Sequence, residues 1–174
     1  MSNRLSGKVA VITGATSGIG KVTAEVFIRE SAKVILAGRS EETGIAIAER
    51  LGENAIFHKT DVMKEADIKS CIDMAVEGFG RLDCLFNNAG GPSKGTLDTV
   101  TKEDFDYSMN LLLGSVVFGI KHAAPIMKEQ KSGCILNNSS IAGIRTNNGQ
   151  YLYSAAKAGV THLTRYFAQF YKRD

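Results

Sequence analysis

The sequence of 174 residues contains no tryptophan, only two prolines and only three cysteines. Three cysteines cannot all pair with one another, and their spacing fits no common metal site, which disfavours a disulfide-stapled fold or a zinc module. No apolar run approaches the ~18 residues that a membrane-spanning helix requires. Residues 1–8 lack the apolar core of a signal peptide. Basic residues exceed acidic residues by 21 to 18 without forming a block, so we expect no nucleic-acid partner.

Hydrophobic residues make up 44% of the chain and charged residues 22%, which is typical of a folded domain rather than a disordered one. The length predicts a single domain over residues 1–174. Cys84 and Cys134 lie inside apolar runs and are expected to be buried, reduced thiols. His58, His122 and His162 are far apart in the sequence, so no metal site is expected. These features together predict a soluble, cytoplasmic protein.

Short β-rich runs alternate with longer helical stretches along the whole chain. The predicted strands cover residues 8–13, 33–37, 55–58, 82–86 and 134–137, and the predicted helices cover residues 19–30, 42–51, 64–79, 102–128 and 151–170. This alternation predicts an α/β fold with a Rossmann-type doubly wound parallel sheet. Such a sheet binds ligands at the carboxyl ends of its strands, where the strand order reverses.

A glycine-rich segment, residues 13–20 (TGATSGIG), follows the first predicted strand directly. Glycines at positions Gly14, Gly18 and Gly20 can adopt positive φ and lack a Cβ, so the backbone can approach a diphosphate closely. The helix that begins near Ile19 points its free N–H groups and the positive end of its dipole at the same place. We therefore expect a dinucleotide-binding turn, although a glycine-rich turn without a ligand is the alternative.

The end of the second predicted strand bears on the choice of cofactor. An acidic residue there binds the ribose 2′-hydroxyl of NAD, but this chain has Gly38 followed by Arg39. Because a guanidinium suits a phosphate, NADP is favoured over NAD. The alternative is that Arg39 is solvated and that Glu41 or Glu42 approaches the ribose.

Two further strand ends carry residues that suit a nucleotide. After the third strand, Asp61 can accept a hydrogen bond from the adenine amine while Val62 packs on the ring; alternatively, Asp61 caps the next helix. The fourth strand ends in the NNAG segment, residues 87–90. Its small residues let a cofactor lie against the backbone, and its asparagines can bridge neighbouring strand ends.

The last predicted helix contains candidate catalytic residues. Tyr153 and Lys157 are four residues apart and share one helix face. An ammonium beside a phenol favours the phenolate, which a catalytic acid or base at neutral pH requires. Tyr151 lacks such a partner because residue 155 is alanine, whereas Ser140 follows the fifth strand and can donate to a substrate carbonyl.

These segments together resemble the short-chain dehydrogenase/reductase family along the whole chain: TGATSGIG at 13–20, DV at 61–62, NNAG at 87–90, Ser140, and YSAAK at 153–157. The resemblance implies an oxidoreductase that transfers a hydride between NADP(H), which is favoured, or NAD(H) and a secondary alcohol or ketone. It implies that Ser140 positions the substrate oxygen, that Tyr153 is the acid/base, and that Lys157 activates the tyrosine and anchors the ribose. The implied cofactor-binding residues are Gly14, Thr16, Ser17, Gly18, Ile19, Gly20, Arg39, Asp61, Val62, Asn88, Ala89, Gly90, Tyr153 and Lys157.

The chain departs from the family pattern at two places. Family members place an asparagine of the proton relay in the long fourth helix, where this chain has Leu112; Asn110 is near but about 200° around the helix. Family members also continue beyond the Tyr–Lys helix with two more strands, so we expect an incomplete domain with an exposed sheet edge. The resemblance further implies a homodimer or homotetramer. The alternative function is a dinucleotide-binding or assembly subunit with little catalysis.

Overall fold

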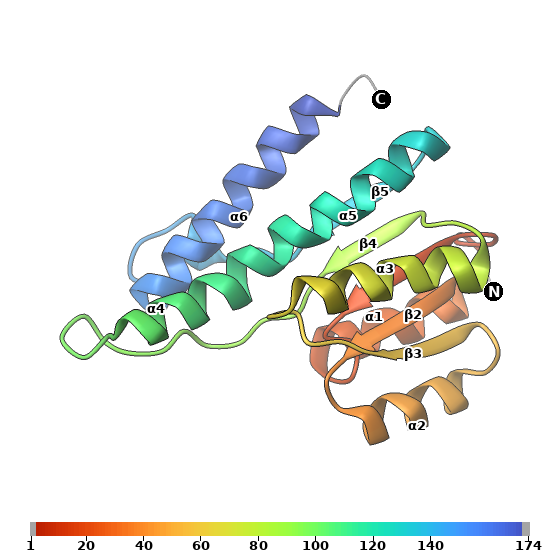
Figure 1. The fold of residues 1–174 in the computed structure, drawn as a ribbon, viewed down its shortest axis with the longest axis horizontal. Helices are drawn as coiled ribbons and strands as arrows, with labels where there is room; N and C mark the ends of the chain where they lie inside the picture. The colour runs from red at the N-terminus through yellow and green to blue at the C-terminus, as the bar shows by residue number, and fades with distance from the viewer. Residues whose placement is uncertain (1–2, 172–174) are drawn as a thin grey trace.

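The computed structural model describes residues 3–171, which form a five-stranded parallel sheet with helices on both faces (Figure 1). The order of the strands across the sheet is β3-β2-β1-β4-β5. Because β2 and β4 flank β1, the order reverses between β1 and β4, and the predicted α/β doubly wound sheet is confirmed. The strands span β1 (Val9–Thr13), β2 (Lys33–Gly38), β3 (Ala55–Lys59), β4 (Cys84–Asn87) and β5 (Cys134–Asn137).

Two layers of helices cover the sheet, and this explains why its central strands are continuously apolar. One set of alternate strand residues, including Ile12 and Leu36, packs against α1 and α2. The other set, including Val11 and Leu85, packs against α3 and α5, and α6 in turn packs on α5. These helices span α1 (Gly18–Arg29), α2 (Glu41–Leu51), α3 (Glu65–Phe79), α5 (Ser115–Gln130) and α6 (Tyr151–Phe170).

The helix predicted over residues 102–128 is interrupted by a wide turn. A capping box formed by Thr101 and Asp104 begins α4 (Lys102–Met109), a π-helical turn covers Asn110–Gly114, and α5 follows. By length and composition only, the whole helix is apolar enough to cross a membrane, which corrects the expectation that no stretch is. A core helix passes the same test, and Leu112 and other apolar residues of this helix are buried inside the protein.

The cysteines are free thiols in different environments. Cys71 is buried, and burial raises its pKa to about 12. Cys84 is partly buried, and burial raises its pKa to about 12 as well. The expectation that Cys134 is buried was wrong: it is exposed because β5 is an edge strand of the described sheet.

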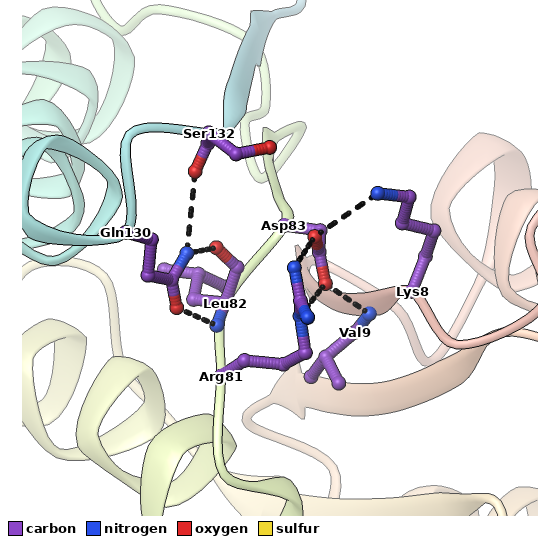
Figure 2. A network of polar contacts seen from close by, with 7 residues as sticks. All are labelled: Lys8, Val9, Arg81, Leu82, Asp83, Gln130 and Ser132. Atoms are coloured by element: carbon purple, nitrogen blue, oxygen red, sulfur yellow. Dashed lines mark hydrogen bonds and ion pairs between the residues drawn. The ribbon is translucent and has the colours of Figure 1, made fainter.

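The amino ends of β1 and β4 are joined by the buried carboxylate of Asp83 (Figure 2). It accepts hydrogen bonds from Val9 N at 3.0 Å and from Arg81 Nε and Nη2 at 2.7 Å each, and Lys8 Nζ lies at 3.4 Å. Burial alone raises the pKa of Asp83, but the bonds from Arg81 and Val9 and the two positive charges outweigh it and hold the pKa below its ordinary value.

A neighbouring amide extends this network to the end of α5. The Gln130 side chain accepts from Leu82 N at 3.0 Å and donates to Leu82 O at 2.7 Å and to Ser132 O at 3.2 Å (Figure 2). At the amino end of the sheet, the polar groups of Asp83 and Gln130 thus find their hydrogen-bond partners within the protein. This arrangement indicates a structural role for this end of the sheet.

We expect Asp83→Asn to lower the free energy of unfolding by about 1–3 kcal/mol at pH 7, because the guanidinium and the Val9 amide lose a charged acceptor. A carboxylate with a depressed folded pKa stabilises fully above its unfolded pKa of about 3.9, and the effect is lost as the pH falls through the folded value. The difference between wild type and variant should therefore shrink in acid. Urea unfolding at pH 7 and near pH 3 measures it, with Asp73→Asn, an exposed partner of Lys69, as a control that should cost under ~0.5 kcal/mol.

Candidate active site

A cavity of about 440 Å³ lies at the carboxyl ends of β1, β4 and β5, where the strand order reverses. Its walls come from the glycine-rich turn, the loop after β4, the π-helical turn, the end of β5 and one face of α6. The lining residues are Gly14, Ser17, Gly18, Ile19, Asn88, Ala89, Gly90, Gly91, Pro92, Leu112, Asn138, Ser139, Tyr153 and Lys157. The structure thus brings most of the sequence-predicted residues into one cavity.

Two of the three glycines in the glycine-rich turn adopt the positive φ that was expected to be open to them, and Gly20 does not. Gly14 and Gly18 have φ angles of +68° and +50°. A Cβ placed on Gly20 would overlap the carbonyl oxygen of Gly14 and lie 2.7 Å from Asn88 Nδ2, so the first turn of α1 can pack this closely only with glycine. The side chain of Ser17, the N-cap residue of α1, makes no capping hydrogen bond, so the cavity borders a helix N-terminus without a side-chain cap.

Thr13 and Asn88 hold this turn against the end of β4. The Thr13 hydroxyl oxygen accepts from Asn88 N at 2.9 Å and Ala89 N at 3.0 Å and donates to Phe86 O at 3.3 Å. Asn88 Nδ2 donates to Thr13 O at 2.9 Å. The interpretation that NNAG asparagines bridge neighbouring strand ends is confirmed for this pair.

Lys157 is the buried cation of the cavity, with 5% of its surface exposed. Its Nζ donates to the carbonyl oxygen of Asn138 at 2.6 Å and lies 5.7 Å from the centre of the Tyr153 ring. Burial of the ammonium holds the pKa of Lys157 below its ordinary value. Tyr153 is half-buried and packs beside Leu111 and Leu112. The helical spacing therefore does place the phenol and the ammonium on one cavity wall.

The two serines after β5 lie in different environments. Ser139 lines the cavity, and its hydroxyl donates to Lys157 O at 3.0 Å and contacts Thr161 Oγ1 at 2.7 Å. Ser140 is not among the lining residues, and its Oγ accepts from Ala142 N at 3.2 Å. A hydroxyl that accepts a hydrogen bond can still donate one.

A short 3₁₀ turn, Ile141–Gly143, connects these serines to α6. A Cβ placed on Gly143 would lie 2.5 Å from the carbonyl carbon of Lys157, so this turn packs directly on the helix backbone. The glycine therefore keeps Ser140 close to the part of α6 that carries the lysine.

The residues predicted for the adenosine end lie outside this cavity. Arg39 is exposed at the end of β2, and Gly38 before it is buried against Thr16, whose Cγ2 would lie 2.8 Å from a Cβ at that position. Asp61 does not cap α3, whose N-cap is Lys64; its Oδ1 instead accepts from Met63 N at 3.1 Å. The helix-cap alternative for Asp61 was therefore wrong.

Leu112 faces the cavity at the position where the family pattern has an asparagine, and it is 1% exposed. Asn110 is exposed and does not line the cavity, as its angular separation on the helix predicted. The wall at the π-helical turn is therefore apolar.

Two other results concern the described residues 3–171. They contain no group of three His, Cys, Asp or Glu residues that could hold a metal ion. A second hollow, of about 470 Å³, lies between α5, α6 and the edge strand β5, and no sequence-predicted site residue lines it.

Asn138 and Ser139 are cavity residues that sequence reasoning did not assign. A signal was present, because the pair Asn137–Asn138 ends β5 in the same way as Asn87–Asn88 ends β4, and Asn87 pairs with Asn137 in the sheet register. The repeated pair indicates that both strands end in amides at the same level of the sheet.

Comparison with known proteins places these features in one family. A family model described as short chain dehydrogenase matches residues 8–174. The chain is 40% identical over 167 residues to tropinone reductase-like 1 of Erythroxylum coca and 38% identical over 169 residues to the 3-oxoacyl-(acyl-carrier-protein) reductase FabG of Thermotoga maritima. The crystal structure of a short chain dehydrogenase/reductase from Burkholderia phymatum in complex with NAD superposes with a TM-score of 0.91 at 33% identity. The chain belongs to the short-chain dehydrogenase/reductase family.

The matches cover nearly all of this chain but less of its relatives. They include 93% of this chain and 61% of tropinone reductase-like 1, 95% and 69% of the Thermotoga reductase, and 97% and 61% of the Burkholderia structure. The chain thus spans about three fifths of the length of two of these three proteins.

We expect Gly20→Ala to lower the free energy of unfolding by about 2–3 kcal/mol, because the new methyl group meets the Gly14 carbonyl rather than a flexible side chain. Gly18→Ala is the matched control: its position is open, and only the left-handed φ is unfavourable, which costs about 1 kcal/mol. Urea unfolding of both variants provides the comparison. Equal losses, or a larger loss for Gly18→Ala, would contradict the close packing described for Gly20.

Proposed function

We propose that this protein is an oxidoreductase that binds NADP(H) or NAD(H) and interconverts a secondary alcohol and a ketone, with Tyr153 as the acid/base. The observation that carries the proposal is the single cavity in which an uncapped, glycine-lined helix start faces Tyr153 and the buried Lys157. Family membership supports the reaction class. The Burkholderia relative was crystallised in complex with NAD, which supports a nicotinamide dinucleotide as the cofactor.

The residues present fit such a cofactor. The glycine-rich turn leaves open space at Gly18, where a Cβ would meet nothing within 4 Å, and the N-terminus of α1 borders the cavity without a side-chain cap, where a diphosphate could bind. Ala89 and Gly90 also line the cavity, and their small side chains leave room beside the turn. When bound, such a cofactor would supply or accept a hydride, that is two electrons and one proton, at the substrate carbon.

The proposed mechanism assigns roles to three side chains, Tyr153, Lys157 and Ser140. Tyr153 Oη gives a proton to the substrate oxygen in reduction and takes it back in oxidation. Lys157 orients the ribose hydroxyls of the cofactor, and its positive charge favours the phenolate of Tyr153. Ser140 donates a hydrogen bond to the substrate oxygen. With Leu112 at the relay position, protons reach Lys157 without help from a side chain of the π-helical turn.

A preference for NADP over NAD rests on the end of β2. Arg39 is exposed there, and Gly38 is packed so closely on Thr16 that an acidic side chain at residue 38 would require Thr16 to move. The exposed guanidinium of Arg39 suits a 2′-phosphate.

We expect Arg39→Ala to weaken NADPH binding by about 10- to 100-fold, the equivalent of one charge-assisted contact, and to leave NADH binding nearly unchanged. Fluorescence titration of the bound nucleotide measures both dissociation constants. Arg145→Ala is the matched control, because it also removes one exposed arginine, in the loop after β5. Equal weakening of NADPH and NADH binding by Arg39→Ala would overturn the proposed preference.

The family also supports a homodimer or homotetramer that associates through α5 and α6. These helices lie side by side at one end of the molecule (Figure 1), and Val117 on α5 and Tyr166 and Phe170 on α6 are exposed. An assembly through these helices would cover apolar side chains that the single chain leaves in water.

A second candidate function is a dinucleotide-binding subunit with little or no turnover. Its support is the apolar wall at Leu112, since a relay that lacks a polar group there is slow at best. Tight NADPH binding with no turnover of any carbonyl substrate would favour this candidate over the oxidoreductase.

We expect Tyr153→Phe to abolish turnover on a panel of ketones and secondary alcohols while NADPH affinity changes less than about threefold, because the hydroxyl acts on the substrate rather than on the diphosphate. Tyr151→Phe is the control: its hydroxyl donates to Thr96 O, and turnover should persist. Steady-state kinetics and nucleotide titration on the same preparations provide the test. Retained turnover in Tyr153→Phe would exclude the proposed mechanism.

A further inference from the structure

Two bridges between asparagine side chains join the ends of β4 and β5. Asn87 Nδ2 donates to Asn137 Oδ1 at 2.8 Å, and Asn138 Nδ2 donates to Asn88 Oδ1 at 3.1 Å. Successive residues of a strand point to opposite faces. The first bridge accordingly continues to α6, because Asn137 Nδ2 donates to Thr164 Oγ1 at 3.0 Å, whereas the second bridge borders the cavity.

The second bridge is part of a longer chain of hydrogen bonds. On one side, Asn88 is bound through Nδ2 to Thr13 O at 2.9 Å and through its backbone N–H to Thr13 Oγ1. On the other side, the carbonyl oxygen of Asn138 accepts from Lys157 Nζ at 2.6 Å. Hydrogen bonds through Asn88 and Asn138 therefore connect Thr13, the first residue of the glycine-rich segment, to the buried ammonium of Lys157.

We infer that Asn138 is a positioning residue for Lys157: its side chain, held by Asn88, fixes the strand-end carbonyl that receives the lysine ammonium. Asn138 lies one residue beyond β5, an edge strand of the described sheet, and its backbone N–H bonds Asn87 O at 2.9 Å. The bridge to Asn88 adds a second tether on the cavity side. The lysine is thereby held in a fixed position relative to the glycine-rich turn.

A fixed acceptor matters here because the ammonium is buried. A buried charge without a hydrogen-bond partner is strongly disfavoured. Within residues 3–171, the ammonium of Lys157 donates its hydrogen bond to the Asn138 carbonyl. The side chain of Leu112, which also lines the cavity, has no polar atom. This inference rests on the proposed role of Lys157 in orienting the cofactor, but the position of the ammonium can be measured without nucleotide.

The test compares Asn138→Ala with Asn137→Ala. Each variant removes one amide bridge between the same two strands, but only Asn138 carries the carbonyl that binds Lys157. The protein is labelled with ¹⁵N-lysine, and the NMR signal of the Lys157 ammonium is identified by its loss in Lys157→Arg. We expect the hydrogens of this ammonium to exchange slowly with water in the wild type and in Asn137→Ala. In Asn138→Ala we expect at least tenfold faster exchange and about tenfold weaker NADPH binding.

Several outcomes would overturn the inference: a rapidly exchanging Lys157 signal in the wild type, an unchanged signal and NADPH affinity in Asn138→Ala, or equal effects of the two alanine variants. Urea unfolding identifies any general loss of stability. If Asn138→Ala does not fold, Asn138→Leu keeps the number of side-chain heavy atoms and removes the same bridge. Failure of the wild type to bind NADPH or NADH would reject the proposed function, whereas the ammonium signal would still decide the role of Asn138.

Discussion

The hydroxyl of Thr13 joins the two strands between which the order of the sheet reverses. By accepting two backbone N–H groups from the end of β4 and donating to Phe86 O, it brings the turn after β1 and the turn after β4 into contact. The first turn of α1 lies close to Gly14 and Asn88 at this junction, where a Cβ on Gly20 would not fit. The wall that would receive a diphosphate is thus a consequence of how β1 and β4 are joined, and the lysine on α6 is tied to the same point through Asn88 and Asn138.

The two ends of the sheet use polar groups in different ways. At the amino end, the Asp83 carboxylate is surrounded by Val9 N–H, Arg81 and Lys8, so the charge is satisfied within the protein and contributes to stability. At the carboxyl end, Lys157 is buried beside a cavity. A cation that is partly satisfied and borders open space is available to a ligand, as is common for groups in active sites.

Periodicity and glycine placement predicted the fold and much of the candidate site, because both follow from local rules. The continuous apolar run over residues 8–13 predicted a strand covered on both faces, and the four-residue spacing of Tyr153 and Lys157 places them on one helix face. The contact between Lys157 and Asn138 was not predictable in this way, since a backbone carbonyl acceptor has no residue type of its own. The exposure of Cys134 also escaped prediction, because an apolar run does not reveal which strand lies at the edge.

The π-helical turn at Asn110–Gly114 lies between α4 and α5. Such a turn holds one residue more than an α-helical turn, and each residue of an α-helix advances the direction of its side chain by about 100°. Deletion of one residue within this turn would return the segment to regular helical pitch and leave the packed faces of both flanking helices as they are. The turn is therefore a site where the length of the chain can change while α5 keeps its place on the sheet.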